Sequence, residues 1–266
     1  MSSLIGYLLP EDSTLKISLL HLLIGTALTG AGAHALNQWQ ERVPDGMMER
    51  TCNRPLPSGR LSAEEALAFS MLLSLLGTIY LWVFINPLTS LLGAVTLLSY
   101  VLVYTPLKSR TELNTWLGAI TGALPPLMGW TAQQGALEAK CLPIFALLYF
   151  WQLPHFFAIA WMYREDYRKG CFRMLSLDDD KGDKTAFQML VNGTLLLMVS
   201  FSFYFVDQGG FFFLIIALLC GAGFMLPIVR FTIDRSVERA KRVFLASIVY
   251  LPVLCSVIVV DRLFLN

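Results

Sequence analysis

The stretch ALAFSMLLSLLGTIYLWVFI, residues 66–85, holds 20 consecutive residues without a charged side chain. An α-helix crosses the hydrocarbon core of a bilayer with about 20 predominantly apolar residues, so this stretch predicts a transmembrane helix. Comparable apolar runs occupy residues 17–36, 88–105, 116–132, 142–163, 187–206, 211–229 and 243–260. We therefore predict an all-α, multi-spanning transmembrane bundle of about eight helices, in a single integral-membrane domain over residues 1–266.

The composition supports a membrane protein and excludes several other classes. Of the 266 residues, 56% are hydrophobic and only 15% are charged, which is unusual for a soluble domain. A net charge of +1 and the lack of a basic tract with interleaved aromatic residues exclude a nucleic-acid partner. The five cysteines are scattered without a CxxC pair, which fits neither a disulfide framework nor a zinc or iron–sulfur site.

Lysine and arginine are concentrated in alternate connections between the predicted spans. They occur repeatedly in residues 42–60, 108–110, 164–184 and 230–242, whereas residues 86–87 and 207–210 contain none. The loop between the fourth and fifth spans contains only Lys140. By the positive-inside rule, the basic loops are predicted to face the cytoplasm.

Three polar residues recur at the end of the first predicted span. Asn37, Glu41 and Asp45 stand at positions i, i+4 and i+8, which places their side chains on one helix face at steps of about 6 Å. Such a row of oxygen atoms suits Mg²⁺, which commonly joins carboxylates to a substrate phosphate. Pro44 predicts a bend before the last of them. The alternative is that these are ordinary polar residues closing a membrane helix.

A cationic loop follows this row. Arg50 and Arg54 lie in a segment stiffened by proline and glycine, where guanidinium groups can clamp phosphate oxygens with two hydrogen bonds each. Ser62 and Glu65 then form a predicted capping box that begins the second span. The loop therefore adds fixed positive charge beside the predicted metal ligands.

A second polar group follows the third span. Tyr104 and Lys108 are four residues apart and can face one site, and Arg110 and Asn114 follow them in the same loop. Pro106 makes a regular helix doubtful at this point. The alternative is a positively charged membrane anchor with an interfacial tyrosine.

A third polar group lies in and after the fifth span. Gln152 and His155 stand deep within an apolar run beside Trp151, and polar residues at such depth are candidates for function because their burial is costly. The alternative for His155 is structural packing. Glu165 and Asp166 follow at the exit of the span and are predicted to complete a second metal site.

Five blocks occur in order and with regular spacing: Asn37-x3-Glu41-x3-Asp45, Arg50-Thr-x2-Arg54-Pro-Leu-Pro-x-Gly-Arg60, Tyr104-Thr-x2-Lys108-x-Arg110-Thr-x2-Asn114, Gly122-Ala-x-Pro-Pro-x-x-Gly-Trp130 and Trp151-Gln-x-Pro-His155-Phe. With these blocks the chain resembles the haem O synthases, the protohaem IX farnesyltransferases of the UbiA prenyltransferase superfamily. The resemblance is strong over residues 32–175 and rests on hydropathy alone in the last three spans. The resemblance implies a bundle of nine helices. The first of these helices is expected to be missing here or reduced to residues 1–10.

The resemblance implies transfer of a farnesyl group from farnesyl diphosphate to a vinyl group of haem b, with Mg²⁺ as the cofactor and haem b as a substrate. It implies that the catalytic residues are Asn37, Glu41, Asp45, Tyr104, Lys108 and Asp166. The implied metal ligands are Asn37, Glu41, Asp45, Glu165 and Asp166. The implied substrate-binding residues are Arg50, Arg54, Arg110, Asn114, Trp151, Gln152 and His155. His155 is expected to ligate or position the haem iron, and His34 is the weaker candidate.

Two other functions remain compatible with the sequence. One is a UbiA-type prenyltransferase that acts on a quinone precursor or a chlorin. The other is a non-catalytic membrane protein that handles haem or helps to assemble an oxidase. The expected partners are farnesyl diphosphate, haem b, the lipid bilayer and haem A synthase or terminal-oxidase assembly proteins. The expected location is the cytoplasmic membrane of a bacterium, with the active-site loops in the cytoplasm.

Overall fold

The computed structural model describes residues 1–10 and 16–261, in which every regular element is a helix. The chain divides into two compact units, each described below by itself. Unit 1 comprises Met1–Leu137 and Arg164–Met174, and unit 2 comprises Glu138–Tyr163 and Leu175–Asn266. The all-α prediction is confirmed. Whether both units form the single predicted domain stays a prediction.

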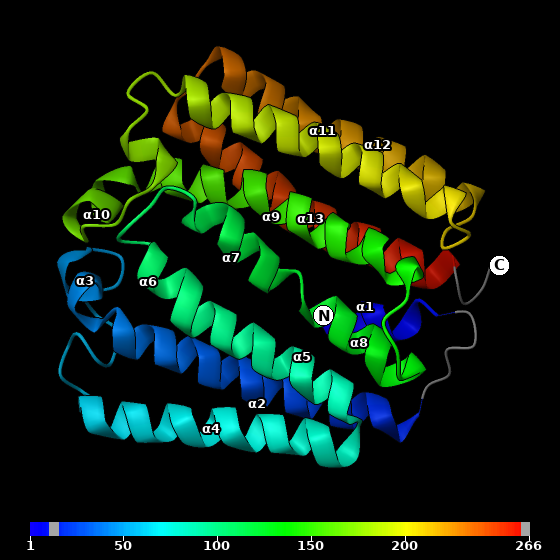
Figure 1. Ribbon diagram of the computed structural model, residues 1–266. Coiled ribbons are helices and arrows are strands. Elements are labelled where there is room, and N and C mark those ends of the chain that lie inside the picture. The colour runs from blue at the N-terminus through cyan, green and yellow to red at the C-terminus, as the bar shows by residue number, and fades with distance from the viewer. Residues whose placement is uncertain (11–15, 262–266) are drawn as a thin grey trace. The chain divides into compact units, whose positions relative to one another are not determined.

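Unit 1 is built around three long helical segments that lie side by side in Figure 1: Ile17–Gln40, Ala63–Phe84 and Pro87–Leu107. Its elements are α1 (Ser2–Leu8), α2 (Ile17–Gln40), α3 (Arg42–Met47), α4 (Ala63–Phe84), α5 (Pro87–Leu98), η1 (Ser99–Tyr104), α6 (Thr105–Leu107), α7 (Asn114–Gly122), α8 (Pro125–Gln134) and α10 (Arg164–Lys169). Ser62 caps α4 together with Glu65, as predicted. Small residues bring α2 and α4 together, because Gly32 lies against Ser74 and Gly77 against Thr29.

Unit 2 is a group of four long helices with a strongly aromatic core. Its elements are η2 (Ala139–Cys141), α9 (Leu142–Met162), η3 (Leu175–Leu177), α11 (Asp183–Phe205), α12 (Phe211–Ile233) and α13 (Val237–Val260). Helices α11 and α12 run side by side in Figure 1, and α9 packs against α11 and α13. Phe203, Phe213 and Phe224 are almost completely buried. The hydroxyl groups of Ser200 and Tyr250 lie 2.6 Å apart within this core.

Among the residues that the structure describes, seven helical segments are long and apolar enough to cross a bilayer, which confirms a multi-spanning membrane protein. The fourth predicted span, residues 116–132, was wrong as a single helix because α7 ends at Gly122 and α8 begins at Pro125. Pro125 and Pro126 have no N–H groups, so the carbonyl groups of Thr121 and Gly122 lose their usual helical donors. The hydropathy of the sequence does not reveal this break, since α7 and α8 are both apolar.

The first ten residues form part of the packing of unit 1. Helix α1 lies against α8 at very close range: a side chain at Gly6 would collide with the carbonyl group of Pro126, and one at Gly129 with that of Ser3. Tyr7 is completely buried, and its hydroxyl lies 2.7 Å from that of Ser18. The segment predicted as a reduced first helix is therefore a short, tightly packed helix.

The third predicted span changes its helical type near its end. Residues of η1 form a π-helix, in which Thr105 donates its N–H to the carbonyl group of Tyr100, five residues earlier. A π-turn inserts one extra residue per turn, which rotates the following side chains relative to a regular α-helix, and such turns are frequent at functional sites. Here the rotated side chains are those that follow Tyr104.

Candidate functional site

The predicted row of oxygen ligands, Asn37, Glu41 and Asp45, continues across the bend between α2 and α3. Glu41 is the C-cap residue that follows α2, but the N–H of Asp45 still bonds to the carbonyl group of Glu41 at 2.7 Å. Pro44 falls in the first turn of α3, where its missing N–H costs little. Asn37, Glu41 and Asp45 have exposed fractions of only 7%, 6% and 1%. Two buried carboxylates this close in the chain require positive partners.

Lys108 is the partner of Glu41. Its ammonium nitrogen lies 2.8 Å from one carboxylate oxygen and donates to the other at 3.1 Å. The same nitrogen lies 4.8 Å from the ring centre of Tyr104 and 5.8 Å from that of Phe172. Burial alone would lower the pKa of Lys108, but the neighbouring Tyr104 and Glu41 raise its pKa overall, so the ammonium stays charged.

Arg54 is the partner of Asp45. Its guanidinium donates to the Asp45 carboxylate at 2.7 Å, and the Thr51 hydroxyl donates to the backbone carbonyl of Asp45 at 2.8 Å. The Arg54 side chain is 34% exposed, so it reaches a buried acid from a partly open position. Arg50 stands nearby in the same loop, with its guanidinium carbon 5.9 Å from the ring centre of Tyr167. Arg110 is exposed.

Asn37 is oriented by the π-helical segment. Its amide nitrogen donates to the Thr105 hydroxyl at 3.1 Å, and that hydroxyl donates to the carbonyl group of Tyr100 at 2.8 Å. Since the nitrogen end is fixed, the Asn37 oxygen is the end left to accept a donor or a cation. Thr105 is not among the predicted site residues, although it stands in the Tyr104 block.

Asp166 and Glu165 have different surroundings although they are adjacent. Asp166 accepts bonds from the backbone N–H groups of Glu49 and Arg50 at 3.4 and 3.3 Å, which holds α10 beside the end of α3. Glu165 is 68% exposed and pairs with Arg168 at 2.6 Å. Within residues 1–10 and 16–261, no three His, Cys, Asp or Glu side chains lie together as a metal site. The structure therefore does not bring the five predicted metal ligands together.

Asn114 joins two loops of unit 1. Its buried amide donates to the carbonyl groups of Thr111 at 2.7 Å and Arg173 at 2.6 Å. The N–H of Arg173 in turn donates to the carbonyl group of Lys108 at 2.6 Å. Asn114 thus holds the segment that carries Phe172 against the backbone of Lys108, and its predicted contact with substrate stays a prediction.

Replacing Asn114 with alanine is expected to loosen this junction. The variant removes the side-chain donor of the Thr111 and Arg173 carbonyl groups, and the loss of two hydrogen bonds at about 0.5–1.5 kcal/mol each is expected to lower the thermal unfolding temperature in detergent. Asn53→Ala provides an amide removal at an exposed position of the same unit and is expected to change the unfolding temperature much less. Equal unfolding temperatures for Asn114→Ala and the wild type would contradict this role.

Two polar residues of α9, Trp151 and His155, contact Ser247 of α13 within unit 2. The indole N–H of Trp151 donates to the carbonyl group of Ser247 at 2.8 Å, and Nδ1 of His155 lies 2.7 Å from the Ser247 hydroxyl. The Gln152 amide donates to the carbonyl group of Leu148, one turn earlier on its own helix. Ser247 had no signal in the sequence, because it lies 92 residues beyond His155 in an otherwise apolar span.

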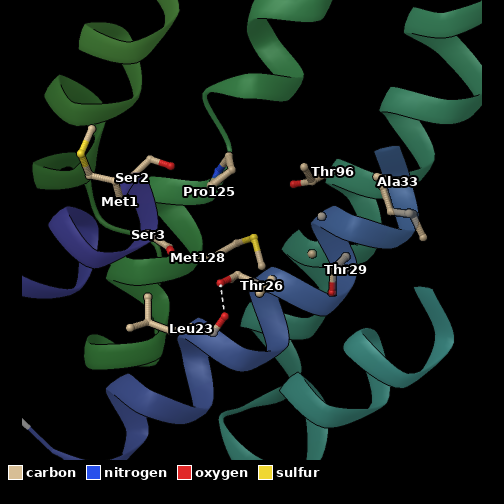
Figure 2. Close-up of a pocket in the computed structure, with 14 residues that line it drawn as sticks. Met1, Ser2, Ser3, Leu23, Thr26, Thr29, Ala33, Thr96, Pro125 and Met128 are labelled. Carbon is tan, nitrogen blue, oxygen red and sulfur yellow. Dashed lines mark hydrogen bonds between the residues drawn. The ribbon is translucent and has the colours of Figure 1, made fainter. Parts of the chain in front are cut away.

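A cavity of about 440 Å³ opens within unit 1 between α1, α2, α5 and α8. Figure 2 shows Thr26 and Thr29 of α2, Thr96 of α5 and Met128 of α8 around it. Each of the three threonine hydroxyls donates to a carbonyl group of its own helix, so the lining keeps its hydrogen-bond donors occupied. Ala33 also lines the cavity and lies one helical turn before Asn37, so the cavity and the polar row share one face of α2.

Comparison with known proteins identifies the family. The family model described as the UbiA prenyltransferase family matches residues 1–249. The chain belongs to the UbiA prenyltransferase family. It is 43% identical to a protein named protoheme IX farnesyltransferase from Solibacter usitatus, over 98% of this chain and 93% of that one. A protein of the same name from Sorangium cellulosum is 43% identical over 90% of this chain and 85% of its own length.

Solved structures of UbiA proteins share the fold. A digeranylgeranylglyceryl phosphate synthase matches with a TM-score of 0.81 and 19% identity, over 98% of this chain and 91% of that one. A homologue from Archaeoglobus fulgidus, bound to DMAPP and Mg²⁺, matches with a TM-score of 0.67 and 15% identity, over 96% and 93% of the two chains. The chain is therefore a multi-pass membrane prenyltransferase, and the resemblance drawn from its motifs is confirmed.

Proposed function

We propose that this chain transfers the farnesyl group of farnesyl diphosphate to a vinyl group of haem b, giving haem O. The observation that carries the proposal is the pairing of two buried carboxylates with two cations, Glu41 with Lys108 and Asp45 with Arg54, beside an apolar cavity. A prenyl diphosphate has a charged head and a hydrocarbon tail, and unit 1 provides one environment for each. The names of the relatives support haem b as the acceptor.

The reaction breaks the allylic C–O bond of the donor and forms a C–C bond to the terminal vinyl carbon of haem. The electron pair of the broken bond leaves with diphosphate, and the cation left on the inner vinyl carbon takes up water and releases a proton. The product then carries a hydroxyethylfarnesyl group. The chemistry depends on stabilising the leaving diphosphate and on keeping water away from the allylic carbon until the C–C bond has formed.

The residues of the polar row suit Mg²⁺ in chemical type, since Asn37, Glu41 and Asp45 offer buried oxygen atoms and two negative charges. When bound, the metal would act as a Lewis acid toward the diphosphate. Asp166 extends from α10 toward the same end of unit 1 through its bonds to the chain after α3. Glu165, which faces Arg168, is the weakest of the predicted ligands.

The two cations that pair with the polar row, Lys108 and Arg54, have a second role in this proposal. Lys108 and Arg54 neutralise Glu41 and Asp45 in the structure, and both carry N–H donors that would bind the phosphate oxygens of a diphosphate. Arg50 and Arg110 add positive charge from the exposed side. Tyr104 holds the Lys108 ammonium over its ring, and Gly118 makes room for that ring, since a side chain there would meet Tyr104 at 2.5 Å.

The proposed location follows from the charges of the loops. The polar row, the Arg50 loop and the Lys108 loop all belong to the basic connections, so we place the site on the cytoplasmic side of a bacterial inner membrane. Trp151, Gln152 and His155 of unit 2 are proposed to contact the haem acceptor. Haem A synthase or proteins that assemble terminal oxidases are the proposed partners, because they consume the product.

A transfer assay tests the proposal directly. Detergent-purified protein supplied with haem b, farnesyl diphosphate and Mg²⁺ is expected to form a more hydrophobic haem on reverse-phase chromatography, with the mass of haem O. Prenylation of an aromatic acid in place of haem would favour a quinone-type acceptor. If neither acceptor is prenylated, the proposed transfer of a farnesyl group to haem b is wrong.

Replacing Gly30 with phenylalanine tests whether the cavity takes the isoprenoid tail. Gly30 lines the cavity and has open space where a side chain would begin, so the aromatic ring fills it without a collision at its first carbon. Excluding one isoprene unit removes the burial of five carbons at about 0.8 kcal/mol each, so the preference for farnesyl over geranyl diphosphate should fall by about tenfold or more in a competition binding assay.

The matched control is Gly223→Phe. Gly223 also has open space around it, but it lies on α12 in unit 2 and does not line the cavity. This variant is expected to keep the wild-type preference for donor length. An unchanged preference in Gly30→Phe would place the tail elsewhere.

A further inference from the structure

His155 is held on three sides by its neighbours in unit 2. Its ring stacks on Trp151 of α9, with centroids 5.2 Å apart, and on Phe244 of α13, with centroids 5.1 Å apart. The interplanar angles of 22° and 29° place the imidazole between two aromatic faces. Its Nδ1 edge meets the Ser247 hydroxyl at 2.7 Å. The ring plane, and therefore the direction of its second nitrogen, is fixed by these contacts.

The Ser247 hydroxyl decides which nitrogen carries the proton. Its oxygen lies 2.6 Å from the carbonyl oxygen of Phe244. A carbonyl oxygen has no hydrogen to offer, so the proton between these two oxygens is the hydroxyl proton of Ser247. That proton is then no longer available to His155. At 2.7 Å from the same hydroxyl oxygen, Nδ1 must itself carry a hydrogen and donate it.

The consequence is a lone pair on Nε2. A neutral imidazole with its proton on Nδ1 presents Nε2 as an acceptor or a metal ligand. In the part of the chain that the structure describes, the hydrogen bond of the His155 ring is the one made by Nδ1. A ligating histidine usually donates its other ring N–H to a fixed partner, which orients the ring and raises its basicity. Ser247 provides such a partner.

Ser247 is itself fixed at two atoms. Its hydroxyl bonds to the helix backbone of α13, and its carbonyl group accepts the indole N–H of Trp151 at 2.8 Å. Trp151 therefore both stacks on His155 and anchors the residue that orients it. This arrangement spans α9 and α13 within one unit and is not needed for packing alone, because a phenylalanine would fill the same space between two aromatic rings without needing a donor or an acceptor.

We propose that Nε2 of His155 binds the iron of the haem acceptor, with Ser247 as the positioning residue that fixes its tautomer. The inference rests on the proposed function for the identity of the ligand, since imidazole commonly binds haem iron axially. It extends that function by assigning the atom that binds the iron and the residue that prepares it.

The other two histidines lack this arrangement. Nδ1 of His21 lies 2.8 Å from the hydroxyl of Tyr80, which can donate or accept, so the tautomer is not decided. The His21 ring also stacks on Phe84 at 4.8 Å. His34 makes an edge contact with the ring of Tyr100 at 5.5 Å and has no hydrogen-bonded partner among the described residues. The chain contains three histidines, so two single variants serve as complete controls.

The test uses purified full-length protein with haem b and no prenyl donor. Resonance Raman spectra of the ferrous complex are expected to show an iron–histidine stretch in the wild type, in His21→Ala and in His34→Ala. His155→Ala is expected to lose the stretch and to regain a five-coordinate signal when free imidazole is added. Ser247→Ala is expected to keep a shifted stretch and to bind haem about 10- to 100-fold more weakly, and Ser247→Thr to restore both.

The possible outcomes separate the inference from the proposed function. A stretch that survives in His155→Ala, or that disappears in His34→Ala instead, would overturn the ligand assignment. Wild-type spectra and affinity in Ser247→Ala would overturn the positioning role. If His155→Ala does not fold, His155→Gln with added imidazole provides the same comparison. The haem-binding test contains no farnesyl diphosphate, so its result does not depend on prenyl transfer. A wild-type protein that binds haem iron through His155 but forms no haem O in the transfer assay would contradict the proposed function alone.

Discussion

Replacing Asp45 with asparagine is expected to lower kcat for prenyl transfer by about a hundredfold or more. The Asp45 side chain is 1% exposed, and asparagine keeps its shape while removing the charge. Groups that stabilise developing charge in a preorganised, water-poor site contribute about 10²- to 10³-fold to turnover. Transfer to haem b, followed by chromatography at saturating substrate, measures the effect, and raising the Mg²⁺ concentration should recover little of it.

The stability of the Asp45→Asn variant should change much less than its activity. Its partner Arg54 is 34% exposed and can turn toward water once the carboxylate is gone. Glu64→Gln is the matched control, because it removes an exposed carboxylate from the first turn of α4 in the same unit. That variant should retain nearly full turnover. Turnover of Asp45→Asn within twofold of the wild type would remove Asp45 from the proposed site.

The sequence was sufficient for those features that depend on composition and local spacing. Runs of apolar residues fall where the long helices are, and the i, i+4, i+8 spacing of Asn37, Glu41 and Asp45 places all three in buried positions despite the bend at Pro44. Charged residues cannot be buried singly, so the cations quoted in the Arg54 and Lys108 blocks were reasonable partners for them. The structure supplies the pairing itself.

Other features depend on contacts between distant residues and could not be predicted. Nothing in an apolar run distinguishes one helix from two, so the break before Pro125 was missed although both prolines were noted in a motif. The π-helix of η1 arises from how Thr105 bonds to Tyr100 and Asn37, which no periodicity encodes. Ser247 acquires its role only when α13 packs against α9.

Adjacent residues of one motif also proved to have unequal surroundings. Glu165 and Asp166 were predicted as a pair of ligands, yet one faces solvent and the other binds backbone N–H groups after α3. A short helix separates neighbouring side chains by about 100°, so only one of two consecutive acids can face a given partner. The helix orientation that decides between them is set by tertiary packing.

Replacing Lys108 with methionine is expected to destabilise the protein by about 3–5 kcal/mol, because it leaves the carboxylate of Glu41 buried without its cation. Glu41 is 6% exposed, so water cannot replace the ammonium without local opening. Thermal or denaturant unfolding of unit 1 in detergent, followed by the reactivity of Cys52, measures the change. Arg110→Met is the matched control for stability, since it removes an exposed cation two residues away and should change stability by less than about 0.5 kcal/mol.

The double variant Glu41→Gln with Lys108→Met separates folding from chemistry. Removing both charges abolishes the unpaired buried ion, so most of the lost stability should return, as it does when a buried ion pair is replaced by neutral groups of similar size. Activity should not return, because the proposed metal site has lost a carboxylate and the diphosphate has lost a cation. A double variant that recovers both stability and turnover would mean that the pair serves only to hold α2 and the Lys108 loop together. Stability without turnover would mean that these charges are retained, at a cost in desolvation, for the leaving group.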